Sequence, residues 1–344
     1  MVAALLAAPI IAAGCSPSQH TAQVVISVPP TSPHPGLFTI LTVGGGGYID
    51  AGGKVVIAPQ FQQTTDFSGN RAAVEVGGKW GFIDPNGTMV IPPTLAYVGC
   101  FSEGRVLFKG SDGKLGYLDA AGSTVVEAKY SNAKPFSEGV AAVRGSEGGW
   151  SFVDYNGTAV NQVLFANADS FGEGLAPARS CESDKWGFVD YYGKFVVAPR
   201  FDWAWPFSSG RARVRLPDKD AFIDKSGTVV FSLPMYEASD FSEDRAVVVR
   251  NAKYGFFDTK GRQVTGFEFD FARAYHDGLA AVEVGKKWGY IDKAGKFVVE
   301  PSYNSAADFL ENRATVSWQA TSSHAGGSAV IDITGRIIWQ GPLE

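Results

Sequence analysis

The sequence predicts an all-β protein built as a tandem array of about nine antiparallel β-meander units, each 34–36 residues long. Two markers carry this prediction. An apolar residue followed by Asp-x-x-Gly recurs at Asp50, Asp84, Asp119, Asp154, Asp190, Asp224, Asp258, Asp292 and Asp332. An aromatic residue keeps the same step at Phe67, Phe101, Phe136, Phe171, Phe207, Phe241, Tyr275 and Phe309. Two markers in phase over most of the chain predict a repeat protein.

Composition agrees with a turn-rich β protein and excludes several other classes. Gly contributes 41 of 344 residues, well above the usual share of about 7%. Hydrophobic residues make up 45% of the chain, which provides a core and excludes global disorder. The net charge of −5 gives no electrostatic footprint for nucleic acid. Four scattered His and three Cys leave little for a zinc site.

The stretch from Phe67 to Phe101 shows the elements of one unit. Residues 72–76 alternate between apolar and polar positions and predict a strand. A Gly-Gly turn follows, and residues 80–84 and 88–91 predict two further strands separated by a second turn. The segment up to Phe101 is either a fourth short strand or the connection to the next unit. Asp-x-x-Gly suits a tight turn, so we interpret the Asp series as structural rather than as calcium ligands.

A Trp-Gly pair begins the second predicted strand of several units. It is intact at Trp80, Trp186 and Trp288, and we interpret Leu115-Gly116, Trp150-Ser151, Tyr254-Gly255 and Ala221-Phe222 as its variants. A large ring beside a Gly can pack on the neighbouring unit while the backbone approaches closely. The pair is therefore expected to serve packing rather than chemistry.

Two architectures accommodate units of this kind. The strands could form the blades of a propeller-like toroid or stack as an open β-solenoid. The order of turns and strands favours the toroid narrowly. Trp318 and Trp339 belong to the last unit, where we expect them to form a cap.

The segments Lys79–Gly87, Lys185–Gly193 and Lys287–Gly295 resemble the bacterial WG repeat, also called the KWG repeat. The resemblance extends over about residues 44–340. It implies a β-rich repeat array of a kind found in bacterial, often exported, proteins. The family has no agreed catalytic activity, so the resemblance implies no catalytic residues.

The amino end predicts export. Residues 2–13 form an apolar run of the length of a signal-peptide core, and Ala12-Ala13-Gly14-Cys15 resembles the bacterial lipobox. We therefore expect a signal peptide over residues 1–14, a lipidated Cys15 that begins a disordered Ser/Thr/Pro tether over 15–36, and the repeat domain over 37–344. Val24 to Val28 could instead form a short edge strand of the domain. No basic residue precedes the apolar run, so we expect the true start to lie upstream.

A search for catalytic constellations finds none. The chain has no Gly-x-Ser-x-Gly elbow, no His or Cys at metal-ligand spacing, and a Gly44–Gly47 run that is not a phosphate loop. We expect no enzymatic activity, no cofactor and no metal. Cys100 and Cys181 lie two units apart, and we expect them not to form a disulfide.

Departures from the repeat mark a candidate binding surface. Trp203 and Trp205 are extra aromatic residues between two units, and Tyr191 and Tyr192 occupy a turn that is polar elsewhere. Together with Arg211 and Arg213, such aromatic side chains could bind sugar rings or a peptide through stacking and cation–π contacts. The alternative is that Trp203 and Trp205 simply pack between units.

These observations favour an exported, lipid-anchored protein whose repeat array is a binding or scaffolding module at the bacterial cell envelope. The expected partners are the membrane, through the lipid anchor, and either an envelope protein or a peptidoglycan-like glycan, but not nucleic acid. One alternative is an envelope hydrolase that uses paired carboxylates in a central cleft. Another is a structural spacer, for which all the exceptional aromatic side chains should be buried.

Overall fold

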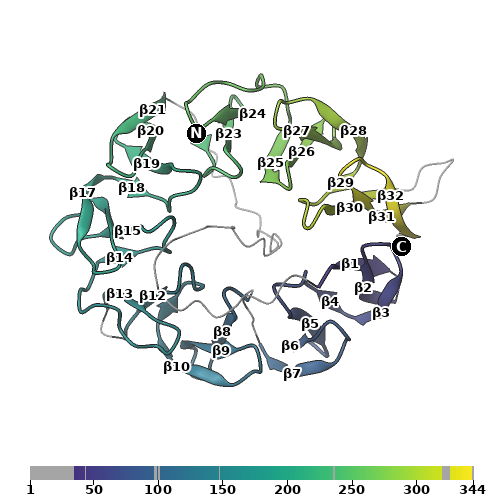
Figure 1. Cartoon of the computed structure of the whole chain (residues 1–344), viewed down its shortest axis with the longest axis horizontal. Coiled ribbons are helices and arrows are strands. Elements are labelled where there is room, and N and C mark those ends of the chain that lie inside the picture. The colour runs from purple at the N-terminus through teal and green to yellow at the C-terminus, as the bar shows by residue number, and fades with distance from the viewer. Residues whose placement is uncertain are drawn as a thin grey trace, which may run out of the picture.

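The protein is a nine-bladed β-propeller (Figure 1). The computed structural model describes residues 35–342 except 43, 97–98, 100, 147, 235–236 and 320–325. Within these residues 32 strands form nine separate antiparallel sheets, and there is no helix. The prediction of a toroid rather than an open solenoid is confirmed. The expected signal peptide, Cys15 and nearly all of the expected tether lie outside the described residues.

The first five blades contain β1 to β17. Blade 1 consists of β1 (Leu37–Thr42), β2 (Gly45–Asp50) and β3 (Val55–Phe61). Blade 2 consists of β4 (Gln63–Thr64), β5 (Ala72–Val76), β6 (Lys79–Ile83) and β7 (Met89–Leu95). Blade 3 consists of β8 (Arg105–Lys109), β9 (Leu115–Asp119) and β10 (Thr124–Tyr130), and blade 4 of β11 (Asn132–Ala133), β12 (Ala141–Arg144) and β13 (Trp150–Val153). Blade 5 consists of β14 (Asn167–Ala168), β15 (Ala176–Arg179), β16 (Trp186–Val189) and β17 (Phe195–Phe201).

The remaining four blades contain β18 to β32. Blade 6 consists of β18 (Trp203–Ala204), β19 (Ala212–Leu216), β20 (Lys219–Ile223) and β21 (Val229–Pro234). Blade 7 consists of β22 (Glu237–Ala238), β23 (Arg245–Arg250) and β24 (Lys253–Asp258). Blade 8 consists of β25 (Phe271–His276), β26 (Leu279–Val284), β27 (Lys287–Asp292) and β28 (Phe297–Tyr303), and blade 9 of β29 (Ser305–Ala306), β30 (Arg313–Trp318), β31 (Gly327–Asp332) and β32 (Ile337–Pro342).

In a complete blade the strands follow one another from the ring's centre to its rim, as β18 to β21 show in Figure 1. Successive strands are antiparallel, so the turn after the first strand and the Asp-x-x-Gly turn after the third lie on one face of the ring, here called the Asp-turn face. The Gly of the Trp-Gly pair lies in the third strand. A Cβ on Gly81 would meet the Ile91 carbonyl oxygen of the outermost strand at 2.5 Å. The close backbone approach that the sequence predicted therefore occurs within a blade.

All nine Asp-x-x-Gly turns have the same geometry. One Asp carboxylate oxygen accepts hydrogen bonds from the backbone amides two and four residues later, as Asp84 does from Asn86 and Thr88 at 2.9 Å each. The Gly has a positive φ, and it contacts the outer part of the preceding blade. A Cβ on Gly227 would lie 2.7 Å from the Val197 side chain. The structural interpretation of the Asp series is confirmed.

A second set of contacts links the turns that follow the innermost strands. The carboxylate of Glu103 accepts hydrogen bonds from the backbone amides of Glu138 and Gly139 in the next blade, at 2.8 and 2.9 Å. Glu138 in turn accepts from the amides of Glu173 and Gly174, at 2.6 and 2.8 Å. The same kind of link recurs from Glu173, Ser209, Glu243 and Asp277 to the following blade. These hydrogen bonds tie each blade from blade 3 to blade 8 to the backbone of the blade that follows it.

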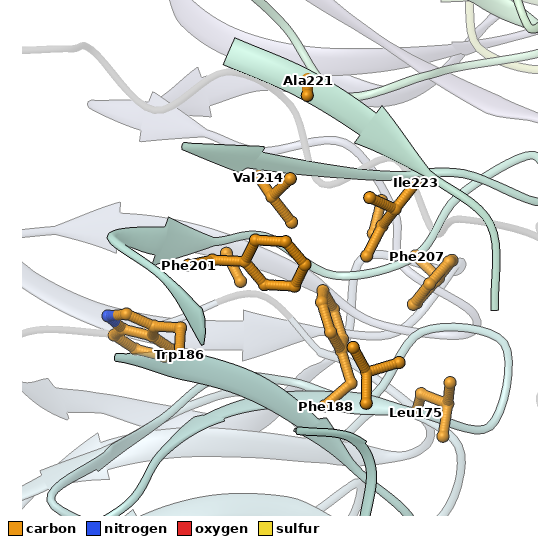
Figure 2. Close-up of a cluster of buried hydrophobic side chains, with 11 residues drawn as sticks. Leu175, Trp186, Phe188, Phe201, Phe207, Val214, Ala221 and Ile223 are labelled. Carbon is orange, nitrogen blue, oxygen red and sulfur yellow. The ribbon is translucent and has the colours of Figure 1, made fainter. Parts of the chain in front are cut away.

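The hydrophobic core is divided into clusters that lie mainly between adjacent blades. Figure 2 shows the cluster between blades 5 and 6, where Phe188 and Phe201 meet Phe207 and Val214, with Trp186 at its edge. Each cluster depends on the blade beside it, so no blade can bury its apolar faces alone.

The ring closes between the last and the first blade. Trp339 of β32 packs against Phe38, Ile40 and Ile49 of blade 1. The Arg313 guanidinium donates a hydrogen bond to the Ala51 carbonyl oxygen at 3.0 Å. The expectation that Trp339 forms part of a cap is wrong, because in the closed ring this side chain packs against the first blade.

We expect Glu138→Ala to destabilise the protein by about 2 kcal/mol, because it leaves two partly buried amides without acceptors. Urea unfolding of the variant measures the loss. The matched control is Glu182→Ala, at an exposed turn position, which should change the unfolding free energy by less than about 0.5 kcal/mol. Equal effects of the two substitutions would contradict the link.

The turn carboxylates predict a pH dependence. Burial works against ionisation of Asp332, yet hydrogen bonds from Thr334 and Arg336 lower its pKa to about 2. Stability from this group is complete above its unfolded pKa of about 3.9 and is lost as the pH falls toward 2. Asp332→Asn should lower the melting temperature by about 2 °C at pH 7, and the difference from wild type should close by pH 2. A difference that is constant from pH 7 to pH 2 would contradict this assignment.

Candidate binding site at the junction of blades 5, 6 and 7

Blade 6 departs from the repeat in its third strand. The register pairs Val214 with Ala221, as Val74 pairs with Gly81 in blade 2. Ala221 therefore occupies the Gly position of the Trp-Gly pair, and Asp220 occupies the Trp position. The sequence interpretation that matched Ala221-Phe222 to the pair is wrong by one residue. Counting four residues back from the turn Asp would have identified Asp220.

Asp220 is a buried carboxylate held by two arginines. Its side chain is 2% exposed. It accepts hydrogen bonds from Nε and one terminal nitrogen of Arg215 at 2.8 and 3.2 Å, and Arg213 approaches it at 3.5 Å. Arg213 also donates to Asp240 of blade 7 at 3.2 Å. The bond with Asp220 raises the pKa of Arg215, so this guanidinium remains charged.

Aromatic rings cover this ionic cluster. The Arg213 guanidinium lies 3.5 Å from the centroid of the Trp205 ring, and that of Arg215 lies 5.7 Å from it. The Trp203 ring is 6.2 Å from Trp205 and 4.9 Å from Trp186 of blade 5. Trp203 is 44% exposed, whereas Trp205 is partly buried. A row of three indoles with arginines beside it thus joins blades 5 and 6.

The other candidate residues lie on the Asp-turn face. Tyr192 belongs to the Asp190 turn, and the seven-residue strand β17, about 23 Å long, separates that turn from the segment that holds Trp203. Tyr192 is 83% exposed. Arg211 donates a hydrogen bond to the Thr259 carbonyl oxygen of blade 7 at 2.9 Å. The structure therefore brings Trp203, Trp205 and Arg213 together and places Tyr191, Tyr192 and Arg211 elsewhere.

Tyr191 is part of a contact between blades. Its ring stacks on Phe171 at 4.3 Å, and its hydroxyl donates to the Glu138 carboxylate at 2.9 Å. Burial and this carboxylate raise the pKa of Tyr191, so the hydroxyl stays protonated as a donor. Tyr155 makes the same kind of contact with Phe136 and Glu103. These two tyrosines reinforce the carboxylate links.

The part of the chain that the structure describes contains no group of three or more His, Cys, Asp and Glu side chains that could hold a metal ion. It also contains no helix long and apolar enough to cross a membrane. Cys181 is an exposed free thiol, and Cys100 lies outside the described residues.

We expect Asp220→Asn to destabilise the protein by about 2–4 kcal/mol, because it removes one charge of a buried ion pair and leaves the arginines uncompensated. Adding Arg213→Met should recover part of this loss, since it removes one of the uncompensated cations. Urea unfolding of both variants measures the effect. A double variant less stable than Asp220→Asn alone would contradict the ionic account of the cluster.

Three comparisons with known proteins bear on identity. A family model for the WG-containing repeat matches seven stretches of the chain: 47–80, 80–114, 116–144, 186–219, 221–254, 254–288 and 288–317. Each stretch begins in the strand that precedes the Asp-x-x-Gly turn of a blade, so the sequence repeat is offset from the structural blade. No curated protein matches the chain.

Solved structures share the fold at low identity. A crystal structure of the eukaryotic initiation factor aligns with a TM-score of 0.59 and 12% identity, over 90% of this chain and 96% of its own. The crystal structure of the computationally designed Ika8 protein aligns with a TM-score of 0.50 and 12% identity, over 73% of this chain and 91% of its own. At such identities the likeness concerns the fold alone. The seven in-register matches decide the family: the chain belongs to the WG-containing repeat proteins.

Proposed function

We propose that this protein is an exported, lipid-anchored binding module of the bacterial cell envelope, which holds a cell-wall glycan or an envelope protein on the surface formed by Trp203, Trp205 and Arg215. The lipobox-like sequence that ends at Cys15 and the uncharged segment that follows it support the anchor. The exposed indole of Trp203 carries the binding proposal.

The surface combines an apolar platform with a fixed cation. Trp203 is 44% exposed although its ring packs on Trp186, so its outer face is held in place before a partner arrives. The Arg215 side chain is 51% exposed and is oriented by Asp220. An aromatic ring of fixed orientation beside a guanidinium suits stacking on a sugar ring or on a planar side chain. Preorganisation of this kind lowers the entropic cost of binding.

The two alternatives differ from this proposal in what they require. A pure spacer should bury its exceptional aromatic side chains, yet Trp203 and Tyr192 are 44% and 83% exposed. A hydrolase needs two carboxylates that a substrate can reach. Asp220 and Asp240 converge on Arg213, but that guanidinium stands between them and Asp220 is buried. These observations therefore favour neither the spacer nor the hydrolase.

Co-sedimentation with purified cell-wall sacculi tests the proposal. A soluble form that begins at Ser16 is compared with its Trp203→Ala and Trp203→Ala/Trp205→Ala variants. We expect at least about tenfold weaker sedimentation of the double variant, because truncation of an aromatic anchor costs more than about 1.4 kcal/mol. Tyr192→Ala, on the opposite face, should bind like wild type, and thermal melting verifies that each variant is folded.

Wild type that stays in the supernatant would exclude the glycan. Photo-cross-linking in cells from a probe at position 203 then tests for a protein partner. If the Trp203 variants sediment like wild type and no protein cross-links to the probe at position 203, the proposed surface is wrong.

A further inference from the structure

Two blades carry an aromatic side chain at a position that is polar in the others. Seven blades have a described innermost strand, whose first residue pairs with the second strand of the blade. In five of them that residue is polar: Gln63, Asn132, Asn167, Glu237 and Ser305. In blades 6 and 8 it is Trp203 and Phe271. Phe271 is 41% exposed, close to the 44% of Trp203.

The surroundings of these two rings repeat as well. The four residues around each ring read Phe-Asp-Trp-Ala in blade 6 and Phe-Asp-Phe-Ala in blade 8. In both places the Asp forms an ion pair with the Lys that stands before the Trp-Gly position of the preceding blade. Asp202 pairs with Lys185, and Asp270 pairs with Lys253 at 2.5 Å. The chain therefore builds one local arrangement twice.

Each exposed ring packs on the ring at the Trp-Gly position of the preceding blade. Trp203 lies 4.9 Å from Trp186 with an interplanar angle of 44°. Phe271 lies 4.8 Å from Tyr254 with an angle of 38°, and 5.7 Å from Trp288 of its own blade. Phe271 is thus held by rings on two sides, so its exposed part is fixed in orientation before a partner arrives.

Both rings lie on the face opposite the Asp-turn face. Each is the first residue of its innermost strand, and these strands run toward the Asp-turn face. Blade 7 alone stands between blades 6 and 8 (Figure 1). Because sheets that pack face to face lie about 10 Å apart, rings that are two blades apart are separated by about 20 Å.

Charged side chains lie between the two rings. Arg215 is 51% exposed and pairs with Trp203 across the strands. Glu237, the first residue of β22 in blade 7, is also exposed. Burial and then the charge of Glu237 raise the pKa of Tyr254, and the same charge adds to the effect of Asp220 on the pKa of Arg215. Glu237 therefore lies close to both aromatic rows.

This order of groups favours a glycan over a protein. A protein interface gathers its aromatic anchors in a desolvated centre and keeps its charges at the rim. Here the charges lie in the middle and an exposed ring lies at each end. Sugar rings can stack on both aromatic side chains, while the hydroxyl groups of the sugars between them accept from Arg215 and donate to Glu237.

We propose that Phe271 is a second sugar-stacking subsite, and that one extended glycan strand runs across blade 7 from Trp203 to Phe271. This inference rests on the proposed function and narrows its partner to a sugar polymer long enough to reach both rings. Once one ring is occupied, the second contact is intramolecular, so a long strand binds more tightly than either subsite alone would allow.

Calorimetric titration with glycan strands of defined length tests the proposal. The strands are freed of peptide from purified sacculi and separated by length. We expect wild type to bind an octasaccharide at least about tenfold more tightly than a disaccharide, which is too short to reach both rings. Phe271→Gln introduces the residue type that blade 2 has at this position. It should weaken octasaccharide binding at least about tenfold and keep the disaccharide site at Trp203.

The matched control is Gln63→Ala, at the same position of blade 2, which should bind both strands like wild type. Thermal melting verifies that each variant is folded. Should Phe271→Gln fail to fold, the length series of wild type decides, because equal affinity for the disaccharide and the octasaccharide would overturn the second subsite.

The outcomes separate this inference from the proposed function. If Trp203→Gln weakens octasaccharide binding and Phe271→Gln leaves it unchanged, the second subsite is wrong and the binding surface at Trp203 stands. If wild type binds neither strand, the glycan is excluded and this inference fails. A protein that cross-links in cells to probes at both position 203 and position 271 would then occupy the surface instead.

Discussion

One contact recurs at every junction from blade 3 to blade 9: a turn side chain, in most cases a carboxylate, accepts hydrogen bonds from backbone amides of the following blade. Glu103, Glu138, Glu173 and Glu243 each hold this carboxylate at a positive φ between 50° and 56°, a conformation that costs an L-residue about 1 kcal/mol. The cost is offset because each carboxylate satisfies amides that would otherwise be unpaired. On the same face, the turn glycines rest on the preceding blade. Every blade is therefore fixed from both sides, and the core clusters form in the spaces that these contacts define.

The candidate site arises where this regular scheme changes. Asp220 replaces an indole that other blades place at the edge of the core, and the volume is taken by Trp203 and Trp205 together with the arginines that neutralise the carboxylate. A buried ion pair contributes little net stability compared with apolar packing. The presence of Asp220 at the Trp position is therefore not explained by stability. Its structural result is that the Trp203 indole is held partly exposed to solvent.

The sequence was sufficient for the number of units, the class of fold and the role of the Asp turns, because each depends on short-range patterns with one geometry. It was insufficient for Asp220, since a one-residue misreading of a degenerate pair shifts a side chain to the other face of a strand. The sequence also did not predict the contact between Tyr191 and Glu138, which lies 53 residues earlier. That contact depends on how two adjacent blades pack together. Trp339 was misread because ring closure depends on the curvature accumulated over nine blades. The Glu that stands two residues after Phe101, Phe136, Phe171 and Phe241 was a visible signal of the carboxylate links.

The accepting side of each link has a consequence for how such rings arise. A backbone amide is present whatever the side chain, so a carboxylate from one blade needs no particular residue in the next. Ser209 and Asp277 take part in the same scheme with shorter side chains. A unit duplicated within a gene therefore brings its own carboxylate and offers its own amides, and it fits between any two existing units. The hydrogen bonds at a new junction then need no compensating mutations, and selection can act on a single exceptional blade while the links between its neighbours stay the same.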